Sequence, residues 1–136
     1  VELETTAAGQ VLVDNRTAEG RGFALVTTGG GAVELVMNDG RTENRWASDP
    51  GSLQAGRAQH VVVIVDGGPK VISFVVDGAF NDGGEWRQFG WGRFSPNLRG
   101  VQGGAEMRIG SRVRGVRVYG RALRTSEAVA AFRAGR

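Results

Sequence analysis

The sequence predicts an all-β fold, a two-sheet antiparallel β-sandwich of the jelly-roll type with one short C-terminal helix. Two observations lead to this prediction. About nine or ten short segments alternate apolar and polar residues, and turn residues separate them at regular spacing. The 23 glycines, well above the usual share of about 7%, favour many tight turns. A chain of 136 residues fits a single domain, here residues 1–136, and buries a real core.

The first part of the chain predicts strands joined by turns. A turn is expected at Asn38, Asp39 and Gly40, because these residue types tolerate positive φ. The last two segments before Gly78 are rich in β-branched residues, which favours the middle of a sheet. The segments predicted as strands are residues 1–5, 10–15, 22–28, 32–38, 43–48, 60–66 and 71–77.

After Gly78 the alternation stops for about thirty residues, which indicates either a functional loop or short irregular strands. Alternation returns at residues 107–110 and 113–120, and both segments are predicted as strands. In the second of them Val116 and Val118 share one face and Arg117 lies on the other.

One helix is predicted over residues 125–135. Thr125 is expected to cap it, and Glu127 suits the positive first turn. Val129 and Phe132 can face the core, and Gly135 is expected to end the helix.

Composition excludes several classes of function. The net charge of +3 is too small to indicate a nucleic-acid partner. The absence of cysteine rules out disulfides and thiol chemistry, and zinc is disfavoured with one histidine and no cysteine. No apolar run approaches the roughly 20 residues that span a bilayer, so membrane insertion is not expected.

Two segments carry a resemblance to a known family. Residues 60–78 read HVVVIVDGGPKVISFVVDG, and residues 107–135 read MRIGSRVRGVRVYGRALRTSEAVAAFRAG. They resemble laminin-G-like domains of the concanavalin A-like lectin/glucanase superfamily. The matching positions are His60, Asp77, Gly78, Val116, Val118, Tyr119, Arg121, Ala122 and Leu123.

The resemblance implies a jelly roll and a noncatalytic binding module, above all for carbohydrate, appended to a larger secreted or cell-envelope protein. An alternative is a structural module that docks on a neighbouring domain or subunit. Family members open with a strand reading like Leu-x-Phe-Asp-Gly, which has no match before Val1. The resemblance therefore implies a piece of a larger protein or a sandwich without one edge strand, and an open edge permits oligomers.

Residues 85–96 read EWRQFGWGRFSP and suggest a sugar-binding loop, because aromatic rings stack on sugar rings while polar groups bond to hydroxyls. The alternative is that these aromatics pack into the sandwich. The candidate ligand-binding residues are Asn44, Arg45, Trp46, Trp86, Arg87, Trp91, Arg93 and Asn97.

Calcium is the candidate cofactor, since many modules of the superfamily hold it. Asp39 and Asp82 are the candidate ligands, although turn chemistry explains both equally well. Catalysis is not expected. The Glu-x-Asp-x-x-Glu motif of the superfamily's glucanases is absent, and only the pair Glu2 and Glu4 and the single His60 offer acid–base groups. A glycoside hydrolase is thus the third and weakest alternative.

Overall fold

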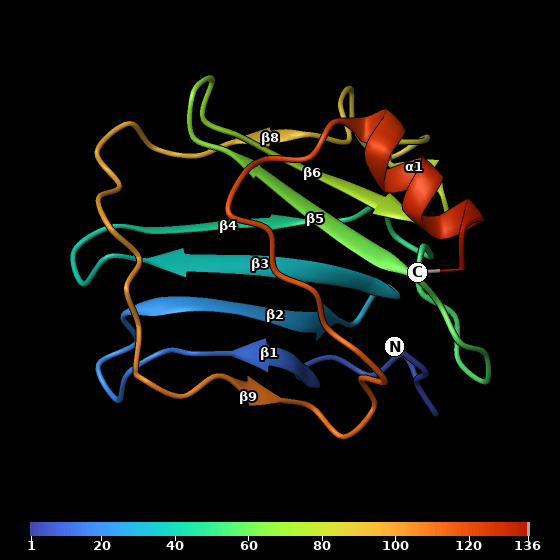
Figure 1. Ribbon diagram of the computed structural model, residues 1–136, viewed down its shortest axis with the longest axis horizontal. Helices are drawn as coiled ribbons and strands as arrows, with labels where there is room; N and C mark the ends of the chain where they lie inside the picture. Colours follow the sequence, from blue (N-terminus) through green and yellow to red (C-terminus); the bar gives the residue numbers. More distant parts are fainter. Residues whose placement is uncertain (136) are drawn as a thin grey trace.

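The computed structural model describes residues 1–135 and shows two antiparallel sheets with one short helix beside them (Figure 1). One sheet has the order β4-β3-β2-β1-β9, and in the other β6 pairs with β5, β7 and β8. The predicted sandwich is confirmed. The elements are β1 (Val11–Asp14), β2 (Gly22–Thr28), β3 (Ala32–Asn38), β4 (Glu43–Ala47), β5 (Val61–Asp66), β6 (Val71–Val76), β7 (Ala79–Phe80), β8 (Gly92–Arg93), β9 (Arg108–Ile109) and α1 (Thr125–Arg133).

The hairpin of β2 and β3 is the most regular part of the fold. Its register runs without a break from Gly22 opposite Asn38 to Thr28 opposite Ala32. Both strands have the bounds that the alternation predicts, because each has one face in the core and a paired neighbour on both sides.

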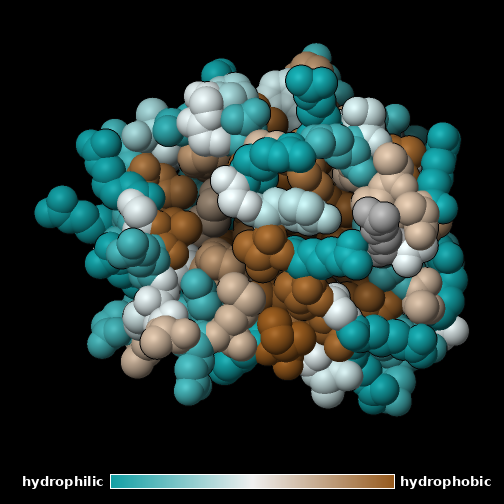
Figure 2. Space-filling model, in the orientation of Figure 1, coloured by the Kyte–Doolittle hydropathy of each residue, from teal (hydrophilic) through white to brown (hydrophobic). Residues whose placement is uncertain are grey.

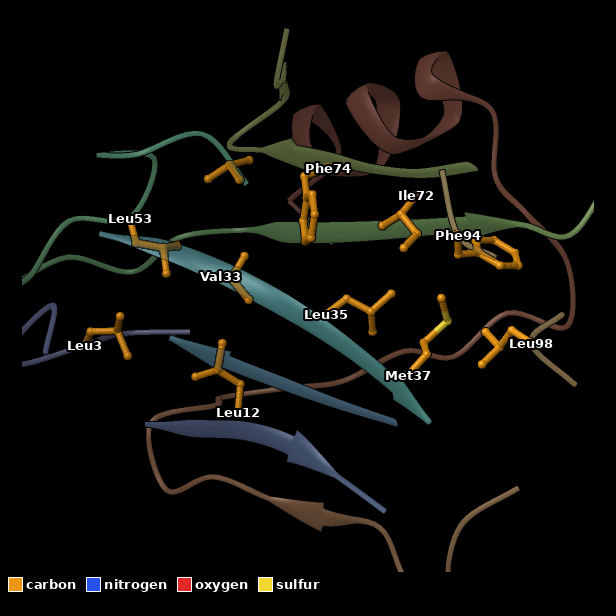
Figure 3. Packing of buried hydrophobic residues seen from close by; sticks show 11 residues of the cluster. Leu3, Leu12, Val33, Leu35, Met37, Leu53, Ile72, Phe74, Phe94 and Leu98 are labelled. Atoms are coloured by element: carbon orange, nitrogen blue, oxygen red, sulfur yellow. The ribbon is translucent and has the colours of Figure 1, made fainter. Parts of the chain in front are cut away.

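The core lies between the two sheets (Figure 3). Ile72 and Phe74 of β6 point toward Val33 and Leu35 of β3 and are fully buried. Burying such a side chain contributes about 1.5–3 kcal/mol, so this layer supplies much of the stability. Leu3, Leu12, Met37, Leu53, Phe94 and Leu98 extend the same cluster.

The helix α1 covers the outer face of the smaller sheet, where Ala128 packs with Ile64 and Val75. The prediction that Thr125 caps the helix is wrong: Arg124 is the cap residue, and the Glu127 carboxylate accepts its N–H at 2.7 Å. Gly135 ends the helix in the left-handed region, at φ 71°. Within residues 1–135 no helix is long and apolar enough to cross a membrane.

The prediction of a strand over residues 113–120 is wrong. Residues 110–124, called the strap below, lead from β9 across the face of the larger sheet to α1 (Figure 1). Residues 113–120 pair with no strand among residues 1–135, although Val116 and Val118 alternate with Arg117 in the sequence, because alternation gives a strand only where a hydrogen-bonding neighbour exists. The expected strand at residues 1–5 is likewise reduced to two isolated bridges, Glu2 with Ala58 and Leu3 with Ala55.

Candidate functional site

Residues 81–98, called the aromatic loop below, connect the two sheets along one side of the sandwich. Its short strand β8 pairs with β6 of the smaller sheet. At the same point Gly92 lies against the ring of Trp46, which belongs to β4 of the larger sheet. A Cβ at Gly92 would overlap that ring, so glycine is needed for this approach.

Arg87 fixes the loop to the larger sheet. Its guanidinium lies 4.2 Å from the centre of a Trp46 ring, a cation–π geometry. It also donates to the Ala47 carbonyl at 2.7 Å and to Oδ1 of Asp49 at 3.0 Å. The planar guanidinium thus combines stacking with hydrogen bonding, as lysine could not.

Asp49 and Asn81 complete this attachment. Oδ2 of Asp49 accepts the Gly83 N–H at 3.1 Å, and the Asp49 N–H donates to Oδ1 of buried Asn81 at 2.7 Å. Nε1 of Trp46 donates to the Gly90 carbonyl at 3.1 Å. The loop is irregular, yet side-chain bonds satisfy its backbone and hold one conformation. We call Trp46, Asp49, Asn81 and Arg87 the loop anchor.

Two aromatic side chains of the loop, Trp86 and Phe89, face solvent. Trp86 is 73% exposed and Phe89 is 48% exposed. Phe89 stacks on half-buried Trp91, with ring centres 4.9 Å apart and an angle of 29° between the rings. A rigid loop that presents flat apolar rings to water is chemically suited to stacking against a ligand.

The remaining predicted ligand residues do not gather at these rings in one group. Asn44 Oδ1 accepts the Ser95 N–H, which ties the end of the loop to β4. Asn97 is exposed and donates its own N–H to Ser95 Oγ at 3.1 Å. Arg93 is exposed in β8 and makes no ion pair with another residue of the described chain.

Arg45 lies on the opposite face of β4 from Trp46, because successive strand residues alternate. It forms ion pairs with Glu34 at 3.1 Å and Glu43 at 2.8 Å. The sequence interpretation that grouped Arg45 with Trp46 therefore joined residues that point to different sides of the sheet.

A second charged group lies at the other edge of this sheet. Asp14 of β1 pairs with Arg16 at 2.9 Å and Arg108 at 3.1 Å. The hydrogen bond from Arg16 lowers the pKa of Asp14 to about 2. The pair with Arg108 joins β1 to β9, and both pairs engage the Asp14 carboxylate.

The two candidate calcium ligands lie in separate loops. The oxygens of Asp39 accept the N–H groups of Thr42, Arg99 and Arg41, which lower its pKa to about 2. Asp82 accepts the Gly84 N–H at 2.9 Å. Within residues 1–135 no group of three or more His, Cys, Asp or Glu is placed to hold a metal ion. Both carboxylates accept backbone N–H groups of their turns, as expected for turn residues. A calcium site at either of them remains a prediction.

The acid–base groups considered for catalysis are also engaged elsewhere. Glu2 pairs with Arg114, and Glu4 pairs with Arg112 at 2.6 Å. His60 lies at the start of β5, with its ring 5.9 Å from that of Phe132 on α1. Glu2 and Glu4 line one pocket together with these two arginines, so each carboxylate there is paired with a guanidinium group.

A family model described as the concanavalin A-like lectin/glucanases superfamily matches residues 2–129 of this sandwich. The chain belongs to this superfamily. The resemblance inferred from residues 60–78 and 107–135 is thereby confirmed, and it extends over nearly the whole chain.

Two solved structures have a similar fold. A carbohydrate-binding module (CBM40) of the Ruminococcus gnavus IT-sialidase, bound to α2,3-sialyllactose, is similar with a TM-score of 0.69 and 15% identity, over 96% of this chain and 78% of that chain. A second structure of the same CBM40 is similar with a TM-score of 0.68 and 15% identity, over 96% of this chain and 78% of that chain. No curated protein sequence matches the chain.

The candidate site residues chosen from the sequence did not include Asp49, Asn81 or Phe89, which belong to or hold the aromatic loop. Asp49 and Asn81 lie in stretches that read as ordinary turns, and they meet only because the loop folds back onto β4. Phe89 belongs to the quoted aromatic stretch, and its spacing of two from Trp91 was a usable signal for a pair of rings on one side.

Proposed function

We propose that this chain is a noncatalytic carbohydrate-binding module that uses the aromatic loop. The observation that carries the proposal is the exposure of Trp86 and Phe89, with Phe89 stacked on half-buried Trp91, on a loop that Arg87 ties to Asp49. Stacked rings need no further ordering when a sugar binds, so little conformational entropy is lost. We call these three rings the aromatic platform.

Two further points support the proposal. The fold neighbours from Ruminococcus gnavus are named as carbohydrate-binding modules, and one is bound to sialyllactose. The carboxylates Glu2 and Glu4 are each paired with an arginine, which favours binding over hydrolysis. A single shallow site binds modestly, and attachment to a larger secreted or envelope protein would add avidity.

The test is a glycan-array screen of the chain, with and without calcium, followed by titration of any hit. Trp86→Ala and Trp91→Ala are expected to weaken binding by about tenfold or more, because each removes a stacking surface. The matched control is Tyr119→Ala, which removes an aromatic that is 48% exposed on the strap, away from the loop. That variant is expected to bind like the unchanged protein.

Three outcomes would contradict the proposal: no glycan bound in either condition, both tryptophan variants binding as tightly as the unchanged protein, or loss of binding in Tyr119→Ala. A hit that is lost only in Arg45→Met would place the site on the outer face of the larger sheet instead. If binding of a glycan requires calcium, the variants Asp82→Asn and Asp39→Asn would show which carboxylate binds the metal, because binding would be lost in that variant.

A further inference from the structure

Arginines gather at the end of the larger sheet where β3 turns into β4. Arg41 lies in that turn, and its N–H donates to Oδ1 of Asp39 at 2.9 Å. The Arg99 N–H donates to Oδ2 of the same carboxylate at 2.7 Å, although Arg99 stands 60 positions after Asp39 in the chain. One buried carboxylate thus holds two arginine backbones side by side.

Arg21 joins this pair from the loop before β2. Its Cδ lies 3.9 Å from the point where a Cβ on Gly40 would stand, so its side chain passes beside the β3–β4 turn. Thr17 holds the loop in place, because its N–H donates to the Arg21 carbonyl at 2.8 Å and its Oγ1 accepts the Arg21 N–H at 3.3 Å. We call Arg21, Arg41 and Arg99 the arginine patch.

The arginine patch lies away from the start of the chain and is open to solvent. Figure 1 shows the β3–β4 turn and the β1–β2 connection at one end of the larger sheet, with the N-terminus toward the other end. Figure 2, in the same orientation, shows hydrophilic side chains projecting at the end that carries the β3–β4 turn. All three arginines are exposed, so a ligand in solution can reach them.

The charge of the patch is not neutralised by the carboxylates around it. None of its arginines forms an ion pair with another residue of the described chain. Asp39 uses both oxygens to accept backbone N–H groups, and Glu43 pairs with Arg45 at 2.8 Å. Glu19, exposed in the turn before Arg21, is the remaining acid of residues 15–22, 38–43 and 97–104. An anionic ligand would complement the excess of positive charge.

The side chains around the patch indicate which kind of anion it suits. No large hydrophobic side chain of residues 16–22, 38–42 or 97–100 is exposed. Single-stranded nucleic acids bind with the help of aromatic rings, and interfacial membrane segments insert apolar side chains, so the patch offers neither partner its usual contacts. Arginine differs from lysine in having a planar guanidinium that forks onto a carboxylate. The surface therefore favours a hydrophilic polymer with carboxylate groups.

We propose that the arginine patch binds an acidic polysaccharide whose sugars carry carboxylate groups. Arg41 and Arg99 donate to carboxylates of neighbouring sugars, and Arg21 extends the contact along the chain. Each exposed charge pair contributes little, so several sugars of one chain must bind together. The patch contains no ring of the aromatic platform, so the proposal stands independently of the function proposed for that platform.

The test uses a fluorescently labelled oligogalacturonate of about six sugars, which offers several carboxylates in one chain. Anisotropy titration against the whole protein at low salt is expected to show saturable binding. The matched ligand is the same oligosaccharide with its carboxylates methyl-esterified, which keeps the sugars and removes the charge. We expect the ester to bind at least about tenfold more weakly.

The variants are Arg41→Gln and Arg99→Gln, which remove a charge and keep the backbone N–H that donates to Asp39. Each is expected to weaken binding of the oligogalacturonate about threefold, and the two together about tenfold. The matched control is Arg117→Gln, which removes the same charge from an exposed position on the strap. That variant is expected to bind like the unchanged protein.

Several results would overturn the proposal. They are no saturable binding, equal binding of the free acid and its methyl ester, or a loss in Arg117→Gln as large as that in the double variant. Binding that is lost in Trp86→Ala and kept in the double arginine variant would place the acidic chain on the aromatic platform instead. Equally tight binding of a DNA strand with the same number of charges, or of vesicles that contain anionic lipid, would show a general attraction to anions.

Discussion

The aromatic loop and the strap are two irregular segments of similar length that the structure treats in opposite ways. The aromatic loop has no alternation, yet the loop anchor fixes it through bonds such as that from Arg87 to Asp49. The strap has the alternation of a strand, yet Val118 is exposed and residues 114–121 have no backbone partner among the described residues.

The difference shows that local pattern and local order are separate properties. A strand needs a second segment to pair with, and Val116 and Val118 have none among residues 1–135. An irregular loop can be rigid when buried side chains satisfy its backbone groups, as Asp49 does for Gly83. The rigid loop carries the proposed carbohydrate site.

The largest expected effect comes from a change in the backbone of the aromatic loop. In Gly90→Ala the new Cβ would overlap the carbonyl oxygen of Asn81, which is backbone and cannot turn aside. We expect a loss of about 1–3 kcal/mol in the free energy of unfolding, measured by urea denaturation, and a more solvent-exposed Trp46 fluorescence.

Gly100→Ala is the control for this prediction. A Cβ there meets nothing within 4 Å, and the residue lies just beyond the loop. This variant is expected to unfold within about 0.5 kcal/mol of the unchanged protein. Equal stability of Gly90→Ala and Gly100→Ala would show that the loop is not held as the structure indicates.

These contacts also explain how far the sequence could predict the molecule. The bounds of β2 and β3 follow from alternation, because both strands have one buried face and paired edges. The loop anchor could not be predicted, since Asp49 and Asn81 are 32 positions apart and meet only in the folded chain. The exposed rings were predicted as a candidate site, while the inward role of Arg87 was not.

Asp39, in the turn between β3 and β4, holds the residue that follows the aromatic loop. Its carboxylate accepts the Arg99 N–H at 2.7 Å, one residue after the aromatic loop ends, together with the N–H groups of Arg41 and Thr42. These bonds lower its pKa to about 2, below the value of about 3.9 in an unfolded chain.

The charge on Asp39 therefore stabilises the folded protein above about pH 4, and this contribution is lost as the pH falls toward 2. We expect Asp39→Asn to melt at a lower temperature than the unchanged protein near pH 6, with the difference vanishing near pH 2. Thermal melts across this range measure it. Asp82→Asn, which removes a charge that accepts one N–H from Gly84, controls for net charge.

A difference in melting temperature between Asp39→Asn and the unchanged protein that stays constant from pH 6 to pH 2 would contradict this assignment. A smaller difference for Asp82→Asn than for Asp39→Asn at pH 6 is expected, because Asp39 accepts three backbone N–H groups and Asp82 accepts one.

The smallest expected effect belongs to the strap. Val118→Thr keeps the β-branched shape and adds a hydroxyl that water can satisfy, so the free energy of unfolding should change by less than about 0.5 kcal/mol. The same substitution at Val33, fully buried on β3, leaves a hydroxyl in the core and should cost about 1–3 kcal/mol. Urea denaturation of both variants measures the contrast. A loss in Val118→Thr as large as that in Val33→Thr would mean that Val118 is buried in solution and that the strap packs against other parts of the molecule.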